Sequence, residues 1–144
     1  MTAIPTEVLL PGPATRASAL ALTAPISFWG GVDPKTGAIA EPRHPEFGQS
    51  VVGRVLLVPA TIGSSSAAAI LLELVHAKRA PAAIVLHEPD AILLLGLIVA
   101  KEMGYDTPIA LRLDRERFAD LNGCELDVSE SGVISRRSET TAIR

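Results

Sequence analysis

The sequence predicts a single α/β domain, and three observations support that fold class. Residues 51–113 read as strand, helix, strand, helix, strand, because apolar runs there alternate with segments of helical spacing. Apolar residues make up 48% of the chain but aromatic residues only 3%, so the core must consist of Ala, Val, Ile and Leu. A length of 144 residues suits one domain whose core needs no disulfide or metal.

Residues 1–50 are predicted to be a β-rich N-terminal part that proline and glycine interrupt. The stretch "ASALALTAPISFW" contains β-forming residues in alternation and favours a strand. The next stretch, "GGVDPKTGAIAEP", predicts a turn or hairpin. Asp33 and Pro34 can start that turn, and Gly37 can supply a positive φ.

Residues 51–113 predict a βαβαβ unit. The strands are expected at residues 51–58, 82–86 and 109–113, and the helices at residues 66–78 and 91–103. Asp90 is expected to cap the second helix, and Gly104 to follow its C-terminus. Continuous apolar strands are typical of parallel sheets covered on both faces, and helix-joined parallel strands imply right-handed crossovers.

Residues 114–144 are predicted to be a C-terminal extension of the same domain. "DRERFADL" favours a short helix, Asn122-Gly123 a turn, and "CELDVSESGVIS" a final hairpin, while the polar end is expected to be loose. No repeat or low-complexity linker divides the chain. Residues 1–144 are therefore expected to form one domain.

Composition and charge disfavour several classes of function. The net charge is −3 and basic residues form only short pairs such as Lys78-Arg79, which disfavours nucleic acid as a partner. The longest apolar run, residues 91–100, is about half a membrane span and is expected to form a buried helix, and no secretory leader is recognisable. The lone Cys124 offers no thiolate set for a metal and favours a reducing, cytoplasmic location.

Gly63-Ser64-Ser65-Ser66 lies where a strand is predicted to end and a helix to begin. The first N–H groups of a helix are unpaired and carry partial positive charge, and a preceding glycine lets a ligand approach the backbone. The position therefore suits an anion pocket lined with hydroxyls, at the sheet edge where α/β folds bind ligands. On spacing alone, a helix cap formed by Ser65 or Ser66 is the preferred interpretation. No Walker lysine or G-x-S-x-G elbow is present.

The segment "ISFWGGVDPKTGAIAEPRHPEFGQSVVGRVLLVPATIGSSS" resembles the signature region of the small subunit of the aconitase X family. The likeness runs over residues 17–113, and Ser-Phe-Trp-Gly-Gly-Val-Asp-Pro is its most specific part. It implies a swivelling β/β/α domain that works with a large subunit, fused or separate. The resemblance places an iron–sulfur cluster or iron centre on that large subunit, and no metal on this chain.

The resemblance also implies a dehydratase site. Gly63-Ser64-Ser65 matches the Gly-Ser-Ser-Arg turn of the aconitase superfamily, in which a serine base takes a proton next to a carboxylate. By position Ser64 would be that base, with Ser65 as the open alternative. Ser65 and Ser66, together with Trp29, Gly30 and Gly31, would contact a small hydroxy acid substrate. Ser66 stands where aconitase has arginine, which argues against citrate or isocitrate.

Members of the family dehydrate cis-3-hydroxy-L-proline or mevalonate 5-phosphate. We prefer the first as the expected substrate, because the sequence shows no dense basic site for a phosphate. Two alternatives of another class remain: a phosphotransfer swivelling domain that uses a histidine such as His87, and a purely structural partner subunit.

Other polar and aromatic residues are interpreted by local context, and the dispersed histidines show no metal-ligand spacing. Trp29 by type alone is a core or interface anchor, and Asp33 a turn starter. His44 is interpreted as a loop hydrogen-bonder and His76 as a surface residue. Asp90 is interpreted as a helix cap rather than an acid/base partner of His87 and Glu88. Arg43 and Arg54 are expected to be solvated cations.

Overall fold

A computed structural model describes residues 3–63 and 65–137. Its strands are β1 (Ala3–Pro5), β2 (Glu7–Leu10), β3 (Thr15–Ala21), β4 (Val55–Val58), β5 (Ala83–Leu86), β6 (Ile109–Arg112), β7 (Glu125–Val128) and β8 (Val133–Arg136). Its helical segments are α1 (Phe28–Gly31), α2 (Ser66–His76), α3 (Ala91–Glu102), the 3₁₀ turn η1 (Arg115–Arg117) and α4 (Phe118–Leu121). The α/β class and the order of the predicted elements are confirmed.

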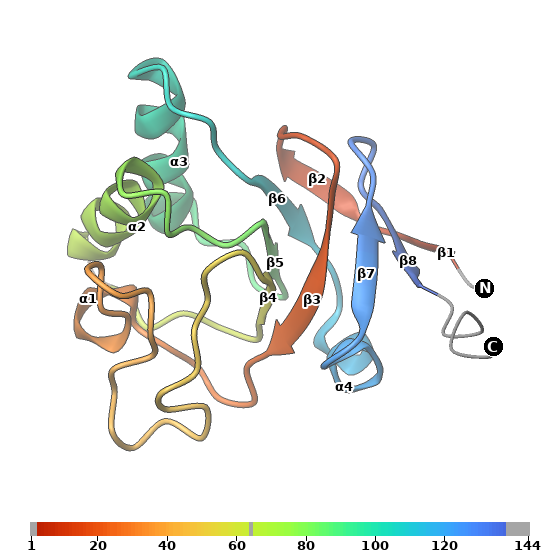
Figure 1. Ribbon diagram of the computed structural model, residues 1–144, viewed down its shortest axis with the longest axis horizontal. Helices are drawn as coiled ribbons and strands as arrows, with labels where there is room; N and C mark the ends of the chain where they lie inside the picture. The colour runs from red at the N-terminus through yellow and green to blue at the C-terminus, as the bar shows by residue number, and fades with distance from the viewer. Residues whose placement is uncertain (1–2, 64, 138–144) are drawn as a thin grey trace, which may run out of the picture.

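The strands form one mixed sheet in the order β1-β8-β7-β3-β4-β5-β6-β2. Strands β3 to β6 are parallel, and the remaining pairs are antiparallel. Strands β1 and β2 lie at opposite ends of this order but are joined by one residue, Thr6. The sheet therefore curls round on itself, as Figure 1 shows on the side away from α2 and α3.

Two hydrophobic cores cover the two faces of the parallel strands. Leu56 and Val58 of β4 face the core under α1, α2 and α3, whereas Val55 and Leu57 face the core inside the curled sheet. Because side chains alternate along a strand, both sets are buried only where both faces are covered. This arrangement confirms the explanation of the continuous apolar strands.

The first predicted strand is shorter than expected. We predicted residues 51–58, but β4 spans only Val55–Val58. Gly53 has a φ of +67°, and the Arg54 N–H donates to the carbonyl of Val51, so the chain turns before the strand starts. Val51 is nevertheless fully buried. This explains why the apolar run, and with it the predicted strand, started at residue 51.

Helix ends and turns largely follow the local signals. Helix α2 ends at His76 rather than residue 78, because Lys78 adopts a φ of +61° that a helix cannot continue. The Asp90 carboxylate accepts hydrogen bonds from the N–H groups of Ile92 and Leu93, which confirms it as the cap of α3. Gly104 follows that helix with a φ of +89°.

Both predicted hairpins are present. The Asp33 carboxylate accepts from the N–H of Lys35, Gly37 has a φ of +78°, and Val32 pairs with Ile39 across the turn. Near the C-terminus β7 and β8 form the final hairpin. The short helix in "DRERFADL" is present as η1 and α4. The loose polar end was predicted for residues 136–144. Arg136 is instead part of β8, whereas residues 138–144 lie outside the described ranges.

Helix α3 differs from the expected fully buried helix. Leu93, Leu94, Gly96, Leu97 and Ala100 are buried. Four other apolar residues of the helix are 38% to 51% exposed, because α3 packs on α2 and the sheet and has no element on its outer side in the described chain. No helix among the described residues is long and apolar enough to cross a membrane.

Gly96 sets the separation of α2 and α3. A Cβ atom built on Gly96 would overlap the carbonyl oxygen of Ala68 in α2. We expect Gly96→Ala to destabilise the fold by about 1–3 kcal/mol through overpacking, although alanine favours a helix by roughly 1 kcal/mol. Urea unfolding would measure this. Leu95→Ala, on the exposed side of the same helix, is the control and should be close to neutral; a stabilised Gly96→Ala variant would contradict the close approach.

Candidate functional site

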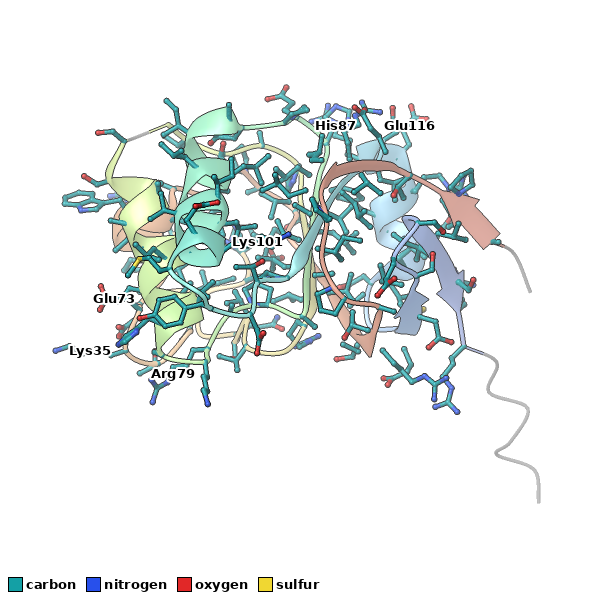
Figure 2. All side chains as sticks on the ribbon, turned by 90° about the horizontal axis from the view of Figure 1, so that it is seen from above. Lys35, Glu73, Arg79, His87, Lys101 and Glu116 are labelled. Carbon is teal, nitrogen blue, oxygen red and sulfur yellow. The ribbon has the colours of Figure 1, made fainter. Side chains whose placement is uncertain are left out.

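The carboxyl ends of the four parallel strands bring the predicted site residues to one edge of the sheet. The Trp29 loop follows β3, the serine loop (residues 59–66) follows β4, and His87 follows β5. At this end the His87 Nδ1 accepts a hydrogen bond from the Arg115 N–H at 3.0 Å, which joins the loops after β5 and β6. Figure 2 shows His87 and Glu116 together at this end.

The serine loop is open to solvent where the structure describes it. Ile62, Gly63, Ser65 and Ser66 are exposed, and nothing lies within 4 Å of a Cβ atom built on Gly63. Ser64, the residue predicted to be the base, lies outside the described residues. The open space at Gly63 means that packing within this chain does not require a glycine there, so a ligand or partner has room to approach the backbone.

Ser65 occupies the N-cap position of α2 but does not cap the helix with its side chain. Its backbone is helical, with φ −62° and ψ −22°, and its hydroxyl makes no capping hydrogen bond. Ser66 is the first helical residue and has an interaction of its own. The interpretation of Ser65 as a simple helix cap therefore lacks its defining hydrogen bond.

Two contacts hold the base of the serine loop. The Thr61 hydroxyl donates to the Asp90 carboxylate at 2.6 Å, so one carboxylate both caps α3 and binds this loop. The backbone of Ile26 pairs with the loop as well: its N–H donates to Ala60, and its carbonyl accepts from Ile62. The loop is therefore anchored to the start of α3 on one side and to the chain after β3 on the other.

The Trp29 loop lies beside these anchors. Of the two roles predicted for Trp29 by residue type, the core role was wrong, and the interface role stays a prediction. Phe28 fills the core at 1% exposure, whereas Trp29 is 60% exposed. Gly30 has a φ of +82°, and a Cβ atom on Gly31 would crowd Ile26 at 3.1 Å. Because the loop packs against α2 and shares Ile26 with the serine loop, the structure brings the two predicted groups of site residues together.

The other histidines have structural partners. His44 is 7% exposed, accepts from the Glu46 N–H at Nδ1, and lies 3.1 Å from the Ala24 carbonyl at Nε2. These contacts confirm His44 as a loop hydrogen-bonder. His76 is exposed and pairs with the Tyr105 hydroxyl, as expected of a surface residue.

His87, Glu88 and Asp90 do not form an acid/base group by the contacts present. Asp90 is engaged by α3 and Thr61, His87 by Arg115, and Glu88 is exposed. The cap interpretation of Asp90 is confirmed. The Thr61–Asp90 contact was missed in the sequence, because a pairing over 29 positions leaves no local signal.

Arg54 corrects another expectation, whereas Arg43 is exposed as predicted. The Arg54 guanidinium is half-buried and donates to the carbonyls of Ser18 and Ala19 at 3.2 and 2.9 Å. These carbonyls lie where β3 changes partner, since Ser18 pairs with β7 and Ala19 with β4. Arg54 is thus a structural cation rather than a solvated one.

The described residues do not suit an iron–sulfur cluster. Such clusters need several thiolates, and Cys124 is the only cysteine of the sequence. Cys124 packs against the core inside the curled sheet, and its thiol lies 3.6 Å from the Asp120 carbonyl. Within residues 3–63 and 65–137 no group of three His, Cys, Asp or Glu side chains could hold a metal ion.

A hollow of about 490 Å³ lies away from the serine loop, between β3 and the final hairpin. Arg16 and Asp127 line it and form an ion pair at 2.6 Å, and the hydrogen bond and charge of Asp127 raise the pKa of Arg16. Both side chains are well exposed. The hollow contains none of the predicted site residues.

A family model described as the aconitase X swivel domain matches residues 4–135. The chain belongs to the aconitase X swivel domain family. This confirms the resemblance that the Trp29 and serine loops carried. The fold also matches a crystal structure of Thermococcus kodakaraensis aconitase X with a TM-score of 0.83 and 24% identity, covering 96% of this chain and 100% of the other. That likeness confirms the expected fold.

Curated relatives of this aconitase X swivel domain are dehydratases. Cis-3-hydroxy-L-proline dehydratase of Pseudomonas aeruginosa is 48% identical over 111 residues, which cover 75% of this chain and 19% of that protein. The phosphomevalonate dehydratase small subunit of Methanopyrus kandleri is 36% identical over 107 residues, or 74% of this chain and 76% of that subunit. The chain thus spans about a fifth of the first relative and three quarters of the second.

We expect the two roles of Asp90 to be separable. Asp90→Ala removes both the cap and the bond to Thr61 and should cost about 2 kcal/mol of unfolding free energy. Asp90→Ser can still cap α3 but is too short to reach Thr61 as well, so its cost should be less than half as large. Urea unfolding of the two variants would test this, and equal losses would show that the cap contributes nothing.

Proposed function

We propose that this chain is the small subunit of a two-subunit aconitase X-type hydro-lyase, with cis-3-hydroxy-L-proline as its substrate. The family match over residues 4–135 carries the proposal. The exposed serine loop at the carboxyl edge of the sheet supports it. Because the relatives include a long dehydratase and separate small subunits, the proposed large subunit corresponds to the remaining part of the long protein.

The proposed reaction removes water from a β-hydroxy acid. A proton leaves the carbon next to the carboxylate, the hydroxyl leaves the neighbouring carbon, and the C–H bonding electrons form the new double bond as the C–O bond breaks. This chain supplies Ser64, which takes the proton. The partial positive charge at the N-terminus of α2 favours the negative charge that a serine base needs. Ser65, Ser66 and the Trp29–Gly30–Gly31 loop contact the substrate.

An iron–sulfur or iron centre is proposed for the large subunit only. In this family such a centre would act as a Lewis acid at the departing hydroxyl. The donor set of this chain does not fit it, since the sequence has one cysteine. The free thiol of Cys124 is compatible with a reducing compartment such as the cytoplasm, the proposed location.

Mevalonate 5-phosphate is the second candidate substrate, because the small subunits of phosphomevalonate dehydratases match most of this chain. It too carries a hydroxyl on the second carbon from a carboxylate. Residues 22–31 and 59–66, which form the two loops at the site, contain no lysine or arginine to bind a phosphate. This absence and the higher identity to the hydroxyproline enzyme favour cis-3-hydroxy-L-proline.

The proposed function is tested with this chain and the aconitase X large subunit of the same organism, purified as a complex. Water elimination from cis-3-hydroxy-L-proline is expected, with weaker or no turnover of mevalonate 5-phosphate. The separated chain should be inactive on both. The reverse preference would assign the second substrate, and incorporation of phosphate from a phosphoryl donor would instead support the phosphotransfer alternative.

Ser64→Ala should lower kcat by about 10²–10⁴-fold, because the variant lacks the proposed base. KM should change less, since other groups bind the substrate. Ser65→Ala is the matched control: it should lower kcat less, and it should change the unfolding free energy by under about 0.5 kcal/mol because Ser65 makes no capping bond. A dead Ser65→Ala beside an active Ser64→Ala would move the base to Ser65. Full activity of both would favour a structural subunit.

Thr61 should affect catalysis through the position of the loop. Thr61→Val keeps the shape of the side chain but cannot donate to Asp90, so kcat should fall by about 10- to 100-fold while KM changes little. Thr61→Ser retains the hydroxyl and should restore most of the rate. Steady-state kinetics of the complex would measure both variants. A loss in Thr61→Ser as large as that in Thr61→Val would contradict the prediction, because it would show that the hydroxyl alone does not position the loop.

A further inference from the structure

The outer side of α3 is an uncovered apolar surface. Ile92, Leu95, Val99 and Met103 are 51%, 50%, 38% and 58% exposed, and they follow one another at intervals of three and four residues. That spacing places them in one stripe along the helix. We call these four residues the α3 stripe. Ile98, which is 44% exposed, lies beside it.

The stripe is unusual for a surface helix. Residues 91–100 contain no charged residue, and the first charges are Lys101 and Glu102 at the C-terminal end. The opposite side of α3 is buried against α2 and the sheet. A helix that is apolar all round is normally covered all round, and contiguous exposed apolar patches mark interaction surfaces.

The stripe starts beside the contact that anchors the serine loop. It begins at Ile92, whose N–H binds the Asp90 carboxylate, and the same carboxylate binds Thr61 of the serine loop. Ile62, the next residue of that loop, is 58% exposed. Figure 2 shows Lys101 toward the far end of α3 from His87, so the stripe runs away from the sheet edge where the site lies.

The area of the stripe argues against a second copy of this chain as its main occupant. Five half-exposed aliphatic side chains present roughly 400 Å², whereas a stable specific interface covers about 800 Å² on each partner. A partner that covers the stripe must therefore extend beyond the helix. The proposed large subunit has to reach the serine loop to complete the site, and in doing so it would cover Ile62 and the stripe in one continuous surface.

We propose that the α3 stripe, together with Ile62, is the surface by which this chain docks on its large subunit. This inference rests on the proposed function. The complementary surface is an apolar groove about as long as α3, lined by aliphatic side chains opposite residues 91–100. Polar groups opposite Lys101 and Glu102 form its rim, as expected where an interface ends.

The test measures binding in the complex with the aconitase X large subunit of the same organism, separately from turnover. Leu95→Lys and Val99→Lys each place a charge in the stripe. Each should raise the dissociation constant by at least about 100-fold, because substitution of a central apolar interface residue has an effect of that size. Leu95→Met keeps an apolar side chain and should bind almost normally. Val8→Lys, at a 36% exposed position on β2, is the matched control and should bind like the parent.

Thermal unfolding of each variant alone should match that of the parent chain, because the substituted positions are exposed. Unchanged binding of both stripe variants would overturn the docking surface, as would a parent chain that binds no large subunit. If the parent chain alone forms concentration-dependent dimers and Leu95→Lys is monomeric, the stripe binds a second copy of this chain instead. Ser64→Ala should bind the large subunit normally, because Ser64 is not part of the stripe. If the parent complex forms through the stripe but does not eliminate water from either substrate, the proposed function is refuted and the docking surface is retained.

Discussion

One strand, β3, belongs to both halves of the sheet, and the rest of the structure depends on how it is paired. Its first residues pair with β7 and its last with β4. At the change of partner, the Arg54 side chain donates to the carbonyls of Ser18 and Ala19. This fixes the curled half against the parallel half, so both cores can close on the same strands.

The candidate site is built on the parallel half of the sheet. The carboxyl ends of parallel strands lie at one edge of the sheet. Here the Trp29 loop follows β3 at that edge and the serine loop follows β4. Asp90 then acts on two elements at once, because it starts α3 and holds the serine loop through Thr61. The same carboxylate therefore links the proposed chemistry to the helix that carries the proposed docking surface.

Local features could be predicted from the sequence, whereas features that depend on distant contacts could not. Asp33, Asp90 and the turn glycines act on backbone groups within a few residues, so their chemistry is visible in a short window. The role of Arg54 spans 35 positions and the Thr61–Asp90 bond 29. Trp29 could not be separated from Phe28 by type, since two adjacent aromatics fit one buried position equally well. The resemblance to the aconitase X family assigned the Trp29 and serine segments to one site before their positions were known. Such a resemblance compares residues along the sequence and does not depend on contacts.

The single residue between β1 and β2 has a consequence for the behaviour of the sheet edges. An unpaired sheet edge offers its N–H and C=O groups to other chains, and native proteins keep such edges short or irregular. Here β1 covers β8 over three residues, and β2 covers β6 with an irregular register between Val8 and Leu10. Both protective strands lie within residues 3–10. Detachment of that one segment would uncover both edges together, so the resistance of this fold to edge-to-edge aggregation depends on the anchoring of its N-terminus.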